Sequence, residues 1–142
     1  MVTPEQLFAE AKKWFASATS ESDYRAVIER AYYAAFHAAN ELEKSLPVRS
    51  TYRRQGVGDH ESLFLTLEHP DQNLDYALQG IGRYIAVQLR IMRPLRTLAT
   101  YKIHNTVAII DVEEALAAAV DVMEECANGQ RKVTQTKRSA AA

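Results

Sequence analysis

The segment ERAYYAAFHAAN at residues 29–40 constrains the fold more than any other part of the chain. At helical spacing its small and apolar residues gather on one face, while polar residues recur along a flank at intervals of three, four and seven. The pattern predicts a helix that packs closely against its neighbours and carries candidate functional side chains on its flank. The packing face comprises Ala31, Tyr32, Ala35, Ala38 and Leu42, and the flank comprises Arg30, Tyr33, His37 and Glu41.

The length and pattern of the chain indicate one all-helical domain. With 142 residues, one core is stable without disulfides. No stretch of useful length has the alternation of a β-strand. We therefore expect an all-α antiparallel bundle over residues 1–128, followed by a disordered basic tail over 129–142, where the sequence becomes polar and lacks acidic residues.

Capping signals and hydrophobic periodicity predict where the helices begin and end. Thr3-Pro4-Glu5-Gln6 is typical of a helix start. Later helices are expected over about 23–45, over 60–69 with Asp59 as cap, from Asp71 or Asn73 to about 98, and from 111 to a stop at Asn128-Gly129. Pro94 is expected to kink the long fourth helix, because proline removes a backbone donor. Residues 100–110 are expected to form a connector.

Several function classes are disfavoured by composition. No run approaches the roughly 18 apolar residues of a membrane span, and the first residues lack a secretory signal pattern. The single cysteine, Cys126, permits no internal disulfide and no cysteine metal cluster. His60 and His69 lack metal-ligand spacing. We expect a cytoplasmic protein with no membrane contact, no metal and no cofactor.

Basic residues without acidic neighbours indicate a candidate RNA surface. Residues 76–110 contain five basic residues and no Asp or Glu. Arginine suits bidentate phosphate contact better than lysine does. An ordinary solvated helix face and an acidic partner surface are the other interpretations. The candidate RNA contacts are Arg83, Arg90 and Arg93 on the fourth helix, opposite an apolar arc of Ile81, Tyr84, Ile85, Val87, Ile91, Met92 and Leu95, together with Arg53 and Arg54 in the preceding loop.

Three segments resemble the HEPN family (higher eukaryote and prokaryote nucleotide-binding domains). Residues 30–39 are identical to part of the helix S-R-A-Y-Y-A-A-F-H-A-A that is common among small bacterial and archaeal members, and Glu29 stands in place of its serine. Residues 59–64, DHESLF, are similar to the family's His-containing entry into its third helix. Residues 95–101, LRTLATY, are similar to its L-R-x-x-A-D-Y. The resemblance covers residues 23–125.

The resemblance implies a homodimeric bundle of about five helices. It also implies, as for many members, a metal-independent endoribonuclease that acts as a toxin or defence effector. In such enzymes a histidine takes the proton of the ribose 2′-hydroxyl, and an arginine holds the scissile phosphate. Carried over to this chain, these catalytic roles fall on Arg96 and His104 of both subunits. Supporting roles fall on Arg30, His37, Tyr101 and Asn105.

The motif departs from the family pattern in its spacing. Seven residues separate Arg96 from His104, one more than usual, and Thr97 stands where Asn or Asp is frequent. The alternative is therefore a non-catalytic HEPN module that pairs with a nucleotidyltransferase-like antitoxin or another defence protein.

Residues on the predicted second helix also have structural interpretations. His37 follows Arg30 by two helical turns, about 10.5 Å along the axis, and a hydrogen bond to Glu41 or to a neighbouring helix is an alternative to a supporting role in the site. For Tyr32, Tyr33 and Phe36 we expect packing in the core or at a dimer interface, with base stacking as the alternative.

Overall fold

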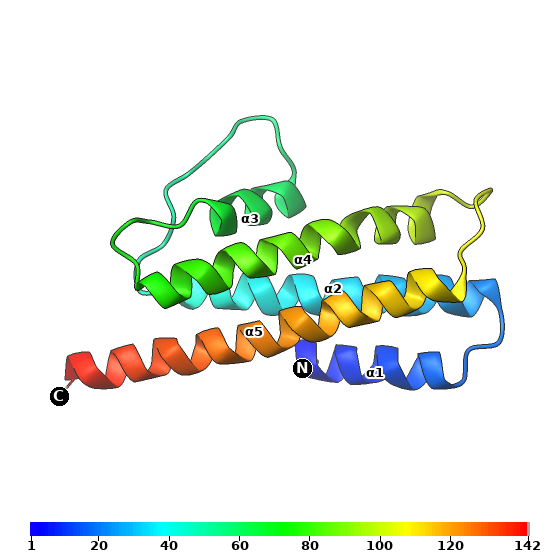
Figure 1. Ribbon diagram of the computed structural model, residues 1–142, viewed down its shortest axis with the longest axis horizontal. Coiled ribbons are helices and arrows are strands. Elements are labelled where there is room, and N and C mark those ends of the chain that lie inside the picture. The colour runs from blue at the N-terminus through cyan, green and yellow to red at the C-terminus, as the bar shows by residue number, and fades with distance from the viewer. Residues whose placement is uncertain (142) are drawn as a thin grey trace.

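The structure, a computed structural model, describes residues 1–141 and contains five helices in that range (Figure 1). They are α1 (Pro4–Ala16), α2 (Glu21–Ser45), α3 (Asp59–Glu68), α4 (Tyr76–Tyr101) and α5 (Ile109–Ala141). The described residues include no strand. The predicted all-α bundle is confirmed.

The helix α2 lies at the centre of the bundle. It packs against α1, α4 and α5, and α4 in turn packs against α3 and α5. Figure 1 shows α1, α2, α4 and α5 lying along the long axis, with the short α3 on the outer side of α4. The last part of α5 extends past the N-terminus of α1. This arrangement leaves α3 to be held mainly by α4.

The packing face predicted for the 29–40 segment is buried. Ala31 and Ala35 are fully buried, and Tyr32, Ala38 and Leu42 are nearly so. Alanine side chains let neighbouring helix axes approach closely, because little side chain separates the backbones. The sequence therefore identified the correct core face of α2.

The N-terminal caps of α1 and α2 form from local sequence. Thr3 Oγ1 accepts the backbone N–H of Gln6, and the Gln6 side chain accepts the backbone N–H of Thr3. Ser20 and Asp23 make the same reciprocal pair at the start of α2. Capping pairs of this kind satisfy backbone donors that have no partner inside the helix.

Three predicted helix starts are wrong. The last helix begins at Ile109 rather than at 111. The fourth helix does not begin at Asp71 or Asn73: Asp75 caps it, and its carboxylate accepts the N–H of Leu78. Asp59 is the first residue of α3, and the cap is Gly58, which offers no side chain. The α4 helix then runs through Pro94 and ends at Tyr101.

The predicted end of the last helix is also wrong. Residues 129–141, predicted to be a disordered tail, continue α5 to Ala141, and residue 142 lies outside the described part of the chain. Gly129 and Val133 are buried. A Cβ at Gly129 would lie 2.8 Å from Cδ2 of Leu42 on α2. Here glycine is the residue that admits a close approach of α5 to α2, so tertiary packing overrides its usual role as a stop signal.

The apolar arc predicted for the fourth helix is only partly correct. Ile85 and Met92 are buried, whereas Tyr84, Val87 and Ile91 are 42%, 53% and 39% exposed. The buried face is rotated toward α3, where Gly82 lies against the backbone of Leu67. The prediction failed because α3 covers part of the face that carries the arginines.

Replacing each of two helical glycines by alanine tests the packing of α5. Gly129→Ala is expected to lower the free energy of unfolding by about 1 kcal/mol, because overpacking against the buried Leu42 exceeds the gain in helix propensity. Gly80→Ala is the matched control, since a Cβ there meets no atom within 4 Å; it should raise stability by up to about 1 kcal/mol. Urea unfolding measures both. Equal stabilisation by the two changes would contradict packing of residues 129–141 on α2.

Candidate functional site

A pocket of about 720 Å³ lies where α1, α2, α3 and the C-terminal half of α4 meet. This volume is typical of sites for small molecules or for parts of larger ligands. Its wall combines aromatic rings with two arginines and two histidines. The lining residues are Trp14, Ala26, Glu29, Arg30, Tyr32, Tyr33, Phe36, His37, His60, Arg96 and Thr100.

The pocket brings together the three segments that resemble the HEPN family. Arg30 and His37 come from α2, His60 comes from α3, and Arg96 comes from α4. Three of these four residues were candidate site residues from the sequence. His60 was not, although it lies in the DHESLF segment that carried part of the resemblance.

The two arginines of the pocket differ in their partners. Arg30 Nε lies 3.4 Å from Glu10 Oε1, and its guanidinium stacks over Trp14 at 5.0 Å. Arg96 stacks over Tyr101 at 5.2 Å and over Tyr32 at 5.9 Å. Within residues 1–141 no carboxylate forms an ion pair with Arg96. Its charge is therefore available to an anion in the pocket.

Both histidines of the pocket contact the ring of Phe36. Ring centroids are 4.4 Å apart for His60 and Phe36 and 5.4 Å apart for His37 and Phe36. His37 also meets the half-exposed Tyr33 edge-on at 4.2 Å. The alternative expected for His37 is a hydrogen bond to Glu41 or to another helix. The described residues contain no such bond. Of the three aromatic residues expected to pack, Tyr32 lies in the core and Tyr33 does not.

His60 is held against Tyr32 by a short hydrogen bond. The distance from Tyr32 Oη to His60 Nδ1 is 2.7 Å, and the two rings are stacked. Burial lowers the pKa of His60, and the positive charges of Arg96 and Arg93 lower it further. Burial raises the pKa of Tyr32 to about 12. Both side chains are consequently uncharged at neutral pH.

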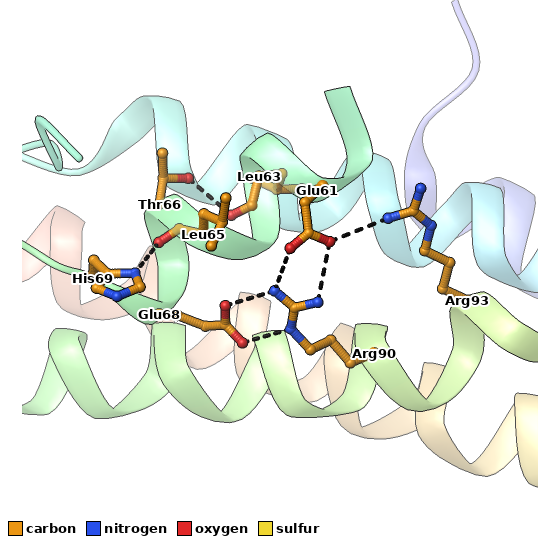
Figure 2. A network of polar contacts seen from close by, with 8 residues as sticks. All are labelled: Glu61, Leu63, Leu65, Thr66, Glu68, His69, Arg90 and Arg93. Carbon is orange, nitrogen blue, oxygen red and sulfur yellow. Dashed lines mark hydrogen bonds and ion pairs between the residues drawn. The ribbon is translucent and has the colours of Figure 1, made fainter. Parts of the chain in front are cut away.

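Ion pairs attach α3 to α4 beside the pocket (Figure 2). Arg90 makes two hydrogen bonds to Glu61 and two to Glu68, at 2.6–3.1 Å, and Arg93 adds one to Glu61 at 3.3 Å. The guanidiniums of Arg90 and Arg93 also lie over the buried ring of Phe64. We call Glu61, Glu68, Arg90 and Arg93 the Arg90 cluster. Because Glu61 follows His60 directly, this cluster fixes the backbone that carries His60.

The arginines predicted to bind RNA have different surroundings in the structure. Arg90 and Arg93 belong to the Arg90 cluster, so carboxylates offset their charge. Arg53 donates to the carbonyls of Ser50 and Tyr52 in its own loop. Arg83 contacts Gln79 at 3.4 Å, and Arg54 is exposed. The face of α4 that carries the arginines is thus covered partly by α3 and does not present a continuous row of free cations.

The structure does not bring His104 into the pocket with Arg96. His104 is exposed in the connector 102–108 and is absent from the pocket wall. Tyr101 and Asn105 are exposed as well. Arg25 holds this connector by donating to the carbonyl oxygens of Leu98, Ala99, Lys102 and Asn105.

Arg25 was not singled out from the sequence, because its partners other than Glu21, one turn earlier on α2, are backbone carbonyls far along the chain. Glu61 was missed for a related reason: its partners lie on α4. Of the residues missed, only His60 had a sequence signal that could have found it.

Comparisons with models of known protein families, with curated proteins and with solved structures find no match. None of the helices in residues 1–141 has the length and apolar character that a membrane span needs. The same residues contain no group of three or more His, Cys, Asp or Glu side chains placed to hold a metal ion.

Loss of the Arg90 cluster should loosen α3. Arg90→Met is expected to lower the free energy of unfolding by about 1–3 kcal/mol, because it leaves the partly buried Glu68 without its partner and Glu61 with Arg93 alone. Arg83→Met is the matched control on the same helix and should change stability by less than about 0.5 kcal/mol. Thermal and urea unfolding compare the two. Equal effects would show that the Arg90 cluster does not hold α3.

The effect of Arg90→Met should also depend on pH. Hydrogen bonds from Arg90 lower the pKa of Glu61 below its ordinary value of 4.5. A carboxyl group whose pKa is lower in the folded protein than in the unfolded chain stabilises the folded protein at pH values above its ordinary pKa. This stabilisation is lost as the pH falls through the lowered pKa. The stability gap between wild type and Arg90→Met should therefore be full at pH 7 and shrink below about pH 4.5. A gap that grows on acidification would contradict this origin.

Proposed function

We propose that this chain is a metal-independent endoribonuclease of the HEPN type, a toxin or defence effector that acts as a homodimer, and that RNA is cleaved at the pocket between α1 and α4. The main support is the convergence of Arg30, His37, His60 and Arg96 on one pocket from three separate segments. A phosphate-binding cation and a proton acceptor are the groups that RNA cleavage through the 2′-hydroxyl needs.

Arg96 is the residue best suited to bind the scissile phosphate. Its guanidinium has no carboxylate partner within the described residues and lies at the wall of the pocket. A planar guanidinium makes paired hydrogen bonds to phosphate oxygens and stabilises the charge that builds up on them in the transition state. Arg30, on the same wall, has Glu10 as a partner and is assigned the supporting role.

His37 fits the role of general base better than His104. It lines the same pocket as Arg96, and its ring has no hydrogen-bond partner among residues 1–141. His37 takes the proton of the 2′-hydroxyl while the 2′-oxygen forms a bond to phosphorus. The bond from phosphorus to the 5′-oxygen breaks, and that oxygen takes a proton from water. The products are a 2′,3′-cyclic phosphate end and a 5′-hydroxyl end.

The second candidate function is a non-catalytic module that binds a nucleotide or pairs with a nucleotidyltransferase-like partner. It is favoured by the position of His104, the expected general base, outside the pocket. The aromatic wall formed by Trp14, Tyr33 and Phe36 suits a nucleobase as well as an RNA strand. RNA cleavage by the purified protein separates this function from the first.

Three single variants test where the chemistry takes place. Arg96→Ala and His37→Ala are each expected to lower the rate of RNA cleavage by at least about a hundredfold, since they remove phosphate binding and the proton acceptor. His104→Ala is the matched histidine control and should retain most activity. The assay follows a labelled RNA in the presence of EDTA and identifies the 2′,3′-cyclic phosphate ends.

Circular dichroism and unfolding curves show whether each variant remains folded. Wild-type protein that is folded but leaves RNA intact would reject the nuclease function. Loss of activity in His104→Ala but not in His37→Ala would restore the assignment made from the sequence.

A further inference from the structure

We propose that Tyr32 fixes His60 as the neutral tautomer protonated on Nε2, and that His60 thereby donates a hydrogen bond to a phosphate group bound beside Arg96. His60 is then a phosphate-binding residue, and Tyr32 is the positioning residue that acts through it. The role of His60 rests on the proposed function for one point, which is that the ligand is an RNA phosphate.

The direction of the hydrogen bond follows from the burial of Tyr32. Only 2% of Tyr32 is exposed, and the sole hydrogen-bond partner of its hydroxyl within residues 1–141 is His60 Nδ1. If Nδ1 carried the proton, the hydroxyl hydrogen would be buried without an acceptor, which costs about 1–3 kcal/mol. If Tyr32 donates, its buried hydroxyl hydrogen is paired with Nδ1, and the remaining donor of the pair is the Nε2–H of His60. Every buried side-chain nitrogen and oxygen in the described residues has a hydrogen-bond partner.

The ring of His60 has little freedom to change this arrangement. Its centroid lies 5.4 Å from that of Tyr32, with the two rings stacked, and 4.4 Å from that of Phe36, with the two rings tilted by 34°. Rotation of the ring by half a turn would place a carbon opposite the Tyr32 hydroxyl and leave its proton unpaired. The next residue, Glu61, is fixed to α4 by the Arg90 cluster. Nδ1 therefore faces Tyr32, and Nε2 is the ring nitrogen left for the pocket.

The charges that face His60 oppose a second proton on its ring. Arg93 and Arg96 on α4 and His37 on α2 disfavour the imidazolium, and only Asp59, the neighbour in α3, favours it. With Nδ1 engaged and the ring neutral, Nε2 carries a hydrogen and has no lone pair to accept a proton. His60 can thus bind an oxygen anion but cannot serve as the base, which leaves proton transfer to His37.

Nitrogen-15 NMR of labelled histidines tests the tautomer without any RNA. The chain has four histidines, and His60 is assigned by replacing His37, His69 and His104 one at a time by glutamine. We expect an Nε2-protonated ring that stays neutral below the ordinary histidine pKa of about 6.5. In Tyr32→Phe the pKa of His60 should rise, because the hydrogen bond to the neutral ring is lost. Tyr33→Phe, which alters the neighbouring tyrosine, should leave His60 unchanged.

Titration with inorganic phosphate tests the role in binding. His60→Phe should weaken phosphate binding about tenfold, the loss expected for one hydrogen bond to a charged acceptor. His60→Gln, which keeps a side-chain donor, should lose less. An Nδ1-protonated or positively charged His60 at pH 7 would overturn the proposal, as would phosphate affinity unchanged in His60→Phe. If the tautomer and phosphate affinity are as expected but RNA stays intact, the nuclease function fails while the role of His60 stands.

Discussion

The attachment of α3 to α4 through the Arg90 cluster is the interaction on which the candidate site depends. The α3 helix has only ten residues and is joined to α2 by a long loop, so local propensity alone does not place it. The guanidinium of Arg90 donates hydrogen bonds to both Glu61 and Glu68 and stacks on the ring of the buried Phe64. With α3 so fixed, His60 lies against Tyr32, and one wall of the pocket is complete.

The same cluster determines how positive charge is distributed. Because Arg90 and Arg93 are engaged by carboxylates, α4 does not present an extended basic face. Arg96, one helical turn beyond Arg93, has no such partner within the described residues and projects its charge into a pocket with aromatic walls. A guanidinium in partly apolar surroundings attracts a phosphate more strongly than one on an open surface. The structure therefore favours a local anion site over a broad RNA footprint.

Local sequence predicted the features that depend on neighbouring residues. The cap formed by Thr3 and Gln6 and the buried alanine face of α2 are of this kind. The rotated face of α4 and the continuation of α5 past Gly129 depend on contacts with α3 and with Leu42, which no local pattern encodes. Part of the candidate site was predictable: Arg30 and His37 were identified in one segment and Arg96 in another, but their meeting point with His60 appears only when α3 docks.

The central claim is that the pocket beside Arg96 binds an RNA phosphate. A crystal structure with a short 2′-O-methyl RNA, which lacks the nucleophilic hydroxyl and stays uncleaved, tests it most directly. We expect a phosphate within hydrogen-bond distance of the Arg96 guanidinium and of His60 Nε2, with its ribose next to His37. RNA bound instead along Arg83 and Arg54, or at the connector around His104, with the pocket empty, would contradict it.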